Sequence, residues 1–256
     1  MNLFDSHAHF QDARFDEDRA KALTEAFDSG VSYIVNVGTD LATSKAAVEL
    51  AERYPGCYAA IGVHPHDCAD IGDRDAVYSE LEQLRRHSKV VAIGEIGLDY
   101  HYDFSDRQTQ MAEFRHQMQW AEETDMPVII HDREAHGDVF SVLRDFPRVT
   151  GILHSYSGSA EWARQLVDMG WYISFSGVLT FANASKCLEA AKAVPMDRLL
   201  IETDCPYLAP VPMRGKRNTS AYVGYTAAKL AELKGVTPTE MAEITAENAK
   251  RVFRIN

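Results

Sequence analysis

The sequence lacks any apolar run of about 18 residues, the length that a membrane-spanning helix needs. Its first residues, Met-Asn-Leu-Phe-Asp, form neither a basic segment nor a long apolar one, so we expect no export signal. C-x-x-C pairs are also missing, and the four cysteines lie far apart, which fits a reducing compartment better than a disulfide framework. A cytoplasmic protein without membrane association is therefore predicted.

The sequence also has no Pro/Gly/Ser-rich linker, low-complexity stretch or charge block. Its 256 residues are 46% hydrophobic, enough to form one large core, so we expect a single domain over residues 1–256. The net charge of −12 argues against a broad basic surface that binds duplex DNA. It still permits a cleft in which a few cations and metal ions bind a strand end. No pattern indicates an obligate protein partner.

Short apolar, β-rich runs recur along the chain, each followed by a segment with helical periodicity. One such helix is expected over residues 106–124, and another begins at the capping sequence Thr237-Pro238-Thr239-Glu240. Eight strands that alternate with helices match a (β/α)₈ TIM barrel better than an open doubly wound sheet, the second alternative. The eight runs are 3–10, 32–38, 57–64, 90–99, 127–133, 151–157, 171–177 and 199–206.

Histidines gather near the ends of the predicted strands, where the loops of such a barrel form the catalytic face. His7 and His9 form an H-x-H motif, and because strand side chains alternate, both imidazoles point to the same side. Taken alone, a buried hydrogen-bonded histidine pair would explain the motif equally well. Glu95 is interpreted as the end of the fourth strand, between Gly94 and Gly97, which would let a ligand approach closely.

Ionisable residues end three further apolar runs: His131 the fifth, His154 the sixth and Asp204 the eighth. A carboxylate buried without a partner is unfavourable, so a shared cation explains these residues. Imidazoles and carboxylates without thiolates suit Zn²⁺, Mn²⁺ or Mg²⁺. Because six ligands exceed the need of one tetrahedral ion, we predict two divalent ions. Glu95 would bridge them, with His7, His9 and Asp204 on one ion and His131 and His154 on the other.

Five segments carry recognisable motifs: FDSHAH at 4–9, GVHPH at 62–66, GEIGLDY at 94–100, PVIIHDR at 127–133 and IETDCP at 201–206. Together they resemble the TatD-type metal-dependent deoxyribonucleases of the amidohydrolase-like barrel superfamily, over essentially the full length. The resemblance implies a (β/α)₈ barrel and divalent metals at the six matching residues. It also implies hydrolysis of phosphodiesters, often from the 3′ end of DNA, with single-stranded DNA or strand ends as the substrate.

A metal-activated water is the expected nucleophile, with Glu95 and Asp204 as catalytic residues and Asp204 as the proton acceptor. The substrate phosphate would dock on His64 and Arg133. Further phosphate contacts are predicted after the eighth strand, although surface salt bridges are an alternative there. These residues are Arg214, Lys216 and Arg217.

Asp5 and Glu202 share the inward phase of neighbouring ligands, and each could orient a ligand or cap a buried backbone group. Cys205 is expected to be packed rather than nucleophilic. Two other functions stay open. One is an amidohydrolase or acyl-ester hydrolase, including a D-aminoacyl-tRNA deacylase, although many barrels that cut amides bridge their metals with a modified lysine where this chain has Glu95. The other is a metal-binding barrel without catalysis.

Overall fold

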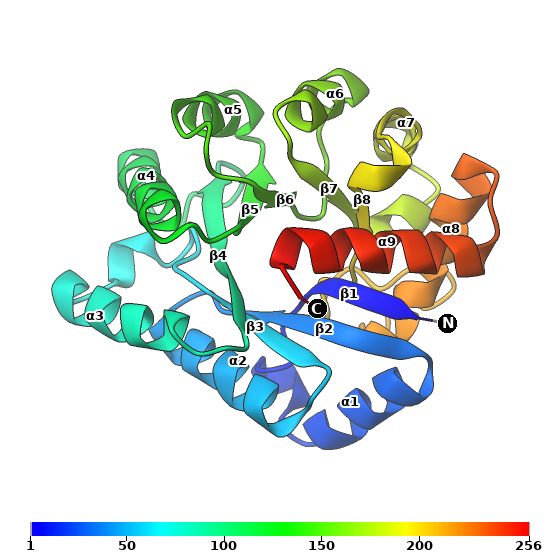
Figure 1. Cartoon of the computed structure of the whole chain (residues 1–256), viewed down its shortest axis with the longest axis horizontal. Helices are drawn as coiled ribbons and strands as arrows, with labels where there is room; N and C mark the ends of the chain where they lie inside the picture. Colours follow the sequence, from blue (N-terminus) through cyan, green and yellow to red (C-terminus); the bar gives the residue numbers. More distant parts are fainter. Residues whose placement is uncertain (1, 256) are drawn as a thin grey trace. The chain divides into compact units, whose positions relative to one another are not determined.

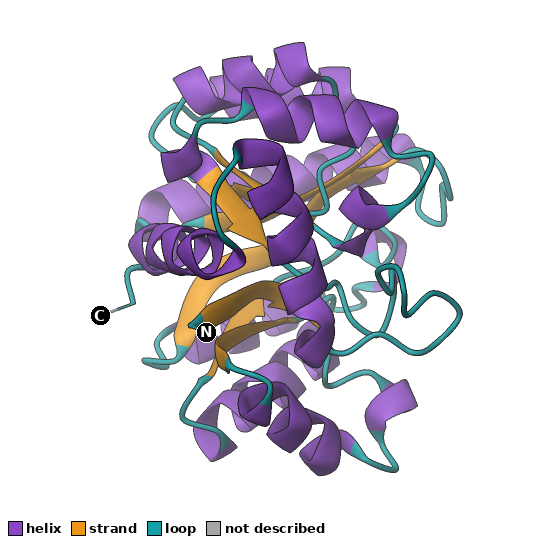
Figure 2. Ribbon diagram, turned by 90° about the vertical axis from the view of Figure 1, so that its right-hand side faces the viewer, coloured by secondary structure: helices purple, strands orange, loops and turns teal. Residues whose placement is uncertain are grey.

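Strands and helices alternate along residues 2–255, the part of the chain that this computed structural model describes (Figure 1 and Figure 2). The strands are β1 (Leu3–Ala8), β2 (Val31–Val37), β3 (Cys57–Ile61), β4 (Val90–Asp99), β5 (Val128–Arg133), β6 (Gly151–Leu153), β7 (Tyr172–Phe175) and β8 (Leu199–Ile201). The helices are α1 (Arg19–Asp28), α2 (Leu41–Arg53), α3 (Arg74–Arg85), α4 (Arg107–Thr124), α5 (His136–Asp145), α6 (Ala160–Asp168), α7 (Ser185–Ala193), α8 (Val223–Lys234) and α9 (Pro238–Phe253).

Within the described residues, the eight strands form one sheet in the sequential order β1 to β8. Neighbouring strands from β3 to β6 pair in parallel, as do β7 and β8. Beyond β8, Cys205 forms an isolated parallel bridge with Ala8 at the end of β1. An open doubly wound sheet would place its strands out of sequence order. The predicted (β/α)₈ barrel topology is therefore confirmed.

Contacts along the chain define two compact units, Met1–Val35 with His154–Asn256, and Asn36–Leu153. In the first unit, α9 contacts β1, β8 and α8 (Figure 1). In the second unit, α2 contacts β3 and α4 contacts β4. The expectation of a single domain stays a prediction.

The helices begin where the capping residues predict. Asp106 accepts hydrogen bonds from the backbone at the start of α4, and that helix runs to Thr124 as expected. Thr237 and Glu240 form the predicted capping box of α9, with Pro238 in its first turn. Local side-chain chemistry therefore sets these boundaries.

The buried face of α4 is more polar than its hydrophobic pattern indicates. Phe114 and Met118 are buried, whereas Met111 is only partly buried. The amides of Gln110 and Gln117 are also fully buried, on the side that faces β3 and β4. Because buried amides need hydrogen-bond partners, these two glutamines hold the backbone near the ends of those strands.

The two glycines beside Glu95 allow β4 and β5 to approach each other. A Cβ atom on Gly94 would lie 2.7 Å from the Cβ of Ile129, and one on Gly97 would lie 2.0 Å from the carbonyl oxygen of His131. Gly97 also has φ of +143°, a conformation that other residues rarely adopt. Both glycines thus allow close packing of β4 against β5, and the expectation that they make room for a ligand stays a prediction.

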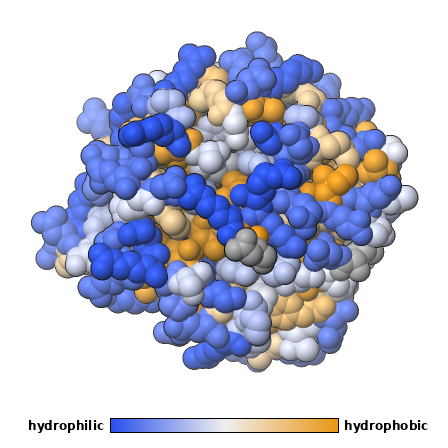
Figure 3. All heavy atoms as spheres, viewed as in Figure 1, coloured by the Kyte–Doolittle hydropathy of each residue, from blue (hydrophilic) through white to orange (hydrophobic). Residues whose placement is uncertain are grey.

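Hydrophilic residues cover most of the face of the molecule drawn in Figure 3. Among the residues described, no helix is long and apolar enough to cross a membrane. Large hydrophobic side chains that are nevertheless exposed are Tyr102, Phe104, Tyr207, Val211 and Tyr225.

Candidate metal centre

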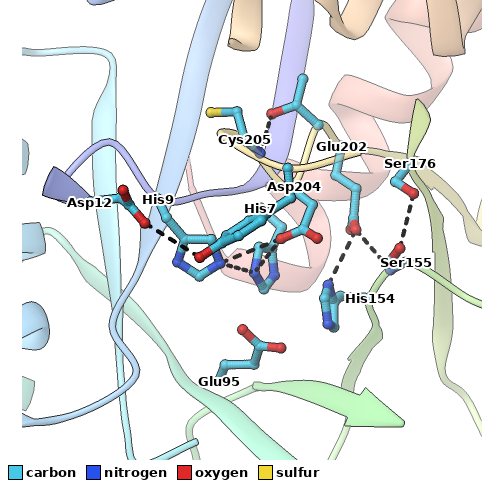
Figure 4. A network of polar contacts seen from close by, with 12 residues as sticks. His7, His9, Asp12, Glu95, His154, Ser155, Ser176, Glu202, Asp204 and Cys205 are labelled. Atoms are coloured by element: carbon cyan, nitrogen blue, oxygen red, sulfur yellow. Dashed lines mark hydrogen bonds and ion pairs between the residues drawn. The ribbon is translucent and has the colours of Figure 1, made fainter. Parts of the chain in front are cut away.

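Strands β1, β6 and β8 lead into a group of polar residues that we call the first cluster (Figure 4). His7 belongs to β1, whereas His9 and His154 lie just beyond β1 and β6. Glu202 and Asp204 follow β8, so the predicted sixth and eighth strands end earlier than expected and their ligands lie on the adjoining segments. The first cluster is His7, His9, His154, Glu202 and Asp204.

The imidazoles of the first cluster converge, as the alternation of side chains along β1 predicts. The Nε2 atoms of His7 and His9 are 3.0 Å apart, and the rings of His7 and His154 stack with their centroids at 4.1 Å. Asp204 Oδ1 lies 3.4 Å from His9 Nε2 and 3.7 Å from His7 Nε2. Burial raises the pKa of Asp204, but a hydrogen bond from His9 and the nearby histidines outweigh it and lower the pKa below its usual value.

The backbone fixes Asp204 independently of its side chain. Its N–H donates to the carbonyl oxygen of His7 at 2.9 Å, and its φ of 57° lies in the left-handed region, which aspartate and asparagine tolerate. Asn218 donates from Nδ2 to the carbonyl oxygens of Thr203 at 2.8 Å and Tyr207 at 2.6 Å, on either side of Asp204. The carboxylate is therefore held towards the histidines of β1.

Glu202 carries a buried carboxylate oxygen that no protein group satisfies. Its Oε1 atom accepts the N–H of Ser155 at 2.7 Å and lies 3.2 Å from His154 Nδ1. Its Oε2 atom is buried and has no hydrogen-bond partner among the described residues. Ligand atoms of His7, His154 and Glu202 lie within 4.8 Å of one another. Because an orphaned buried carboxylate oxygen is unfavourable, this donor set fits a divalent cation.

Asp5 has the capping role, which was one of its two predicted alternatives. Oδ1 accepts the N–H groups of Thr203 at 2.9 Å and His7 at 3.3 Å. Oδ2 accepts the hydroxyls of Thr203 and Ser220, both at 2.5 Å. Complete burial raises its pKa to about 7, against the opposing effect of these hydrogen bonds. Asp5 thus ties β1 to the segment that carries Asp204. Glu202 has both predicted roles, because it caps the backbone N–H of Ser155 and also contacts the predicted ligand His154.

The second cluster lies on β4, β5 and the segment after β3, and consists of His64, His66, Glu95, Asp99 and His131. Glu95 does not end β4 as predicted, because the strand continues to Asp99. The β4–β5 register shifts between Ile93 and Ile96, around Glu95. His131 Nδ1 lies 2.7 Å from Glu95 Oε1, and His64 Nε2 lies 3.5 Å from the same oxygen. Ligand atoms of these three residues fall within 4.8 Å of one another, which also fits a cation.

Asp99 joins the histidines of the second cluster to the loop after β4. Its Oδ2 atom lies 3.1 Å from His131 Nε2 and 2.9 Å from His66 Nε2. Its Oδ1 atom accepts the N–H groups of His101 at 3.0 Å and Tyr102 at 2.9 Å. Burial raises the pKa of Asp99, but the hydrogen bonds outweigh this effect and hold the pKa well below its usual range. An ionised Asp99 thus fixes the orientation of His131 and the path of the loop.

The buried glutamines of α4 position the second cluster through hydrogen bonds to its backbone. Gln117 bonds both the N–H and the carbonyl oxygen of Val63 at 2.8 Å, next to His64. Gln110 accepts the N–H of Asp99 at 2.9 Å and donates to the carbonyl oxygens of Asp99 at 3.0 Å and Ser105 at 2.8 Å. The two glutamines therefore hold the backbone at Asp99 and next to His64.

Burial disfavours the charged form of His64. Desolvation lowers its pKa to about 4, although the carboxylate of Glu95 opposes the shift. The imidazole is therefore uncharged near pH 7. Its assignment to substrate binding stays a prediction, in which it would act as an uncharged hydrogen-bonding group.

The predicted phosphate-binding cations are all exposed. Arg133 lies with its guanidinium carbon 4.6 Å from the ring centroid of Tyr102, and Arg214 lies 3.9 Å from that of Phe181. The guanidinium of Arg217 pairs with both carboxylate oxygens of Asp18, at 2.6 and 2.8 Å. Arg217 therefore forms the surface salt bridge that was its alternative explanation. Lys216 is exposed in the same loop.

His66 and Asp99 were missing from the predicted site. A period-two count along β4 places Glu95, Gly97 and Asp99 on the same side of the strand, which could have indicated Asp99. His66 stands two residues after His64, the same spacing as between His7 and His9, which could have indicated His66. Cys205 is buried, as expected, and burial raises the pKa of its thiol, which disfavours a nucleophilic role.

The comparisons agree with this architecture. The sequence model of the family "TatD related DNase" matches residues 4–254. The uncharacterized metal-dependent hydrolase YabD of Bacillus subtilis is 48% identical over 256 residues, which cover 99% of this chain and 100% of that protein. A protein of Citrobacter koseri named 3′-5′ ssDNA/RNA exonuclease TatD is 35% identical over 260 residues, which cover 99% of each chain.

The crystal structure of YJJV, a TatD homolog from Escherichia coli, is similar to this chain with a TM-score of 0.92 and 32% identity, and covers 99% of this chain and 98% of that one. Fold and donor residues together define a metal-dependent hydrolase built on a (β/α)₈ barrel. The chain belongs to the TatD family of such hydrolases.

Proposed function

We propose that this protein is a divalent-metal-dependent nuclease that hydrolyses phosphodiester bonds of single-stranded DNA, starting from the 3′ end. The observation that carries the proposal is the buried, partnerless Oε2 atom of Glu202 beside His7 and His154, because it indicates a cation in the first cluster. The name of the Citrobacter koseri relative supports a nucleic-acid substrate. The four buried free cysteines support a cytoplasmic location.

The proposed ligands are the six residues expected from the sequence, with Glu202 as an additional donor. Bound ions would supply Lewis-acid chemistry, which polarises the phosphate and makes water more acidic. Imidazole and carboxylate donors suit Zn²⁺ and Mn²⁺, and a carboxylate-rich set also accepts Mg²⁺. The six residues are His7, His9, Glu95, His131, His154 and Asp204.

The protein groups have separate tasks in this mechanism. Asp204 has a lowered pKa, so it is ionised at neutral pH and can accept the proton of the attacking water. Arg133 is exposed next to the second cluster and can donate paired hydrogen bonds to a phosphate. His64 is uncharged and can contact the phosphate without adding charge. Asp99 keeps the ring of His131 in one orientation.

Cleavage of an amide or of a D-aminoacyl-tRNA ester is the competing function. A panel of substrates decides between them: single-stranded DNA, single-stranded RNA, a small phosphodiester, an amide and an aminoacyl ester, each with Mg²⁺, Mn²⁺ or Zn²⁺. The proposed function predicts that single-stranded DNA has the highest kcat/KM. A preference for the amide or the aminoacyl ester would refute it.

Metal removal should abolish hydrolysis. After chelation and dialysis, we expect kcat to fall by at least about a hundredfold, because neither the water nor the phosphate is then polarised. Adding back one divalent metal at a time should restore it. Elemental analysis and the rate are measured on the same sample. Full activity in a sample without detectable metal would contradict the proposal.

Removing the cations of the loop after β8 should weaken oligonucleotide binding. We expect the double variant Arg214→Ala/Lys216→Ala to raise KM for an oligonucleotide more than for a small phosphodiester, because only the longer substrate reaches flanking positions. The slope of log K against log salt should also fall, by up to about 0.7 for each lost contact with a single strand. Binding titrations at several salt concentrations measure this slope.

Arg217→Ala is the matched control for that loop. Since its guanidinium is already paired with Asp18, this variant should lose a surface ion pair and leave the salt dependence unchanged. Equal effects of the double variant on both substrates would instead place the loop in the chemistry or in the fold.

A further inference from the structure

The loop between β4 and α4 exposes two aromatic rings that stack on each other. The centroids of Tyr102 and Phe104 are 5.3 Å apart and their planes differ by 9°. The side chains are 47% and 68% exposed, respectively. The guanidinium of Arg133 lies 4.6 Å from the centre of the Tyr102 ring. A stacked, solvent-facing pair of aromatic rings beside a cation needs a functional explanation, since large hydrophobic side chains are usually buried.

This pair is anchored directly to the second cluster. His66 packs edge-on against Phe104 at 4.9 Å and against Tyr102 at 5.5 Å, measured between ring centroids. The same His66 binds Asp99 through Nε2, and its ring centre lies 6.2 Å from that of His131. Asp99 also accepts the backbone N–H of Tyr102. The rings therefore keep a fixed position relative to a proposed metal ligand.

We propose that Tyr102 and Phe104 form a stacking platform for one nucleobase of a single-stranded nucleic acid, next to the scissile phosphate. This inference rests on the proposed function. Aromatic rings stack on any base without reading its sequence, and a nearby arginine adds a cation for the backbone phosphate or for the base. Arg133 supplies that cation. The platform would thus select strands with an unpaired base.

A nucleobase suits this surface better than an apolar partner. The surroundings of the rings are polar and charged, with His101 paired to Glu134 and Arg107 paired to Asp103 in or beside the same loop. A flat π system can use the ring faces while its polar edges stay in water. A phosphate linked to that base through its sugar can then reach the neighbouring second cluster.

The test compares three oligonucleotides of the same length. The first is a normal strand, the second has an abasic residue at its 3′-terminal position, and the third has an abasic residue at its penultimate position. We expect Phe104→Ala and Tyr102→Ala to raise KM about tenfold for the normal strand. One of the abasic strands lacks the base that stacks on the platform. Its KM should already be high in the unmodified protein, and neither alanine variant should raise it further. Tyr102→Phe keeps the ring and should behave like the unmodified protein.

A second readout does not depend on catalysis. The fluorescence of 2-aminopurine, placed at the position that the abasic series identifies, should be quenched when the strand binds to metal-depleted protein. The quenching should be lost in Phe104→Ala. Tyr225→Ala is the matched control, because Tyr225 is an exposed aromatic residue on α8, at 39% exposure, and the proposal gives it no contact with substrate.

The outcomes separate the two proposals. If the unmodified protein cleaves the normal strand but the loop variants alter normal and abasic strands equally, or alter neither, the platform is refuted and the nuclease function stands. If the unmodified protein cleaves no oligonucleotide, the nuclease function fails and the platform fails with it. Circular dichroism checks that each variant is folded, and the high exposure of Phe104 predicts that its removal leaves the fold intact.

Discussion

Replacement of Asp204 by asparagine should lower kcat by about 10²- to 10⁴-fold while KM for an oligonucleotide changes little. Asparagine keeps the size and the left-handed backbone conformation of Asp204, so the N–H bond to His7 remains. What is lost is the negative charge beside His7 and His9 and the capacity to accept a proton. Steady-state kinetics at saturating metal measure the effect.

Asn218→Ala is a useful comparison for Asp204→Asn. It removes the hydrogen bonds that hold the segment around Asp204 and leaves the carboxylate in place. We expect it to lower thermal stability and to reduce kcat less than Asp204→Asn does. If Asp204→Asn keeps more than about a tenth of the kcat of the unmodified protein, another group accepts the proton.

Glu95→Gln should reduce both metal content and hydrolysis, the latter by at least about a hundredfold. The amide has nearly the same shape as the carboxylate, but it carries no charge and binds divalent ions weakly. In the second cluster, the carboxylate also holds His131 at 2.7 Å, so that imidazole would lose its orientation. Elemental analysis and isothermal titration with Mn²⁺ or Zn²⁺ give the number of bound ions.

The number of ions lost tests the bridging role predicted for Glu95. Loss of both ions agrees with a shared ligand, and loss of one ion assigns Glu95 to a single site. Two tightly bound ions with near-normal hydrolysis would refute any metal-binding role. Glu134→Gln is a suitable control, because Glu134 is an exposed carboxylate just after β5 that pairs with His101.

All eight strands could be predicted because runs of β-branched and other apolar residues between helical segments mark buried parallel strands. The ends of β4 at Asp99 and of β5 at Arg133 were predicted correctly, whereas those of the other strands were predicted too late. The first run was expected to reach Phe10, whereas β1 ends at Ala8, and the eighth was expected to reach Pro206, whereas β8 ends at Ile201. The residues beyond these ends are mostly still buried, so a sequence pattern that reports burial does not show where regular strand pairing stops.

The site could be predicted only in part, because some of its residues look like ordinary turn or surface residues in the sequence. His7 and His9 could be predicted as ligands because ionisable residues near the ends of other apolar runs accompany their H-x-H motif. Asp99 does not, since a single aspartate at the end of a strand commonly caps a turn. Gln110 and Gln117 are harder still, because a glutamine on a helix is normally solvated, and only the fold shows that both amides face strand backbone.

The two carboxylate oxygens of Asp99 have different hydrogen-bond partners. Oδ2 contacts the histidines, whereas Oδ1 holds the loop through the backbone N–H groups of His101 and Tyr102, which every residue except proline would keep. Mutations at positions 102 and 104 can therefore change what the loop presents to a ligand without altering its anchor. In the proposed platform, exchange of these two side chains would change substrate preference while Asp99 still orients His131.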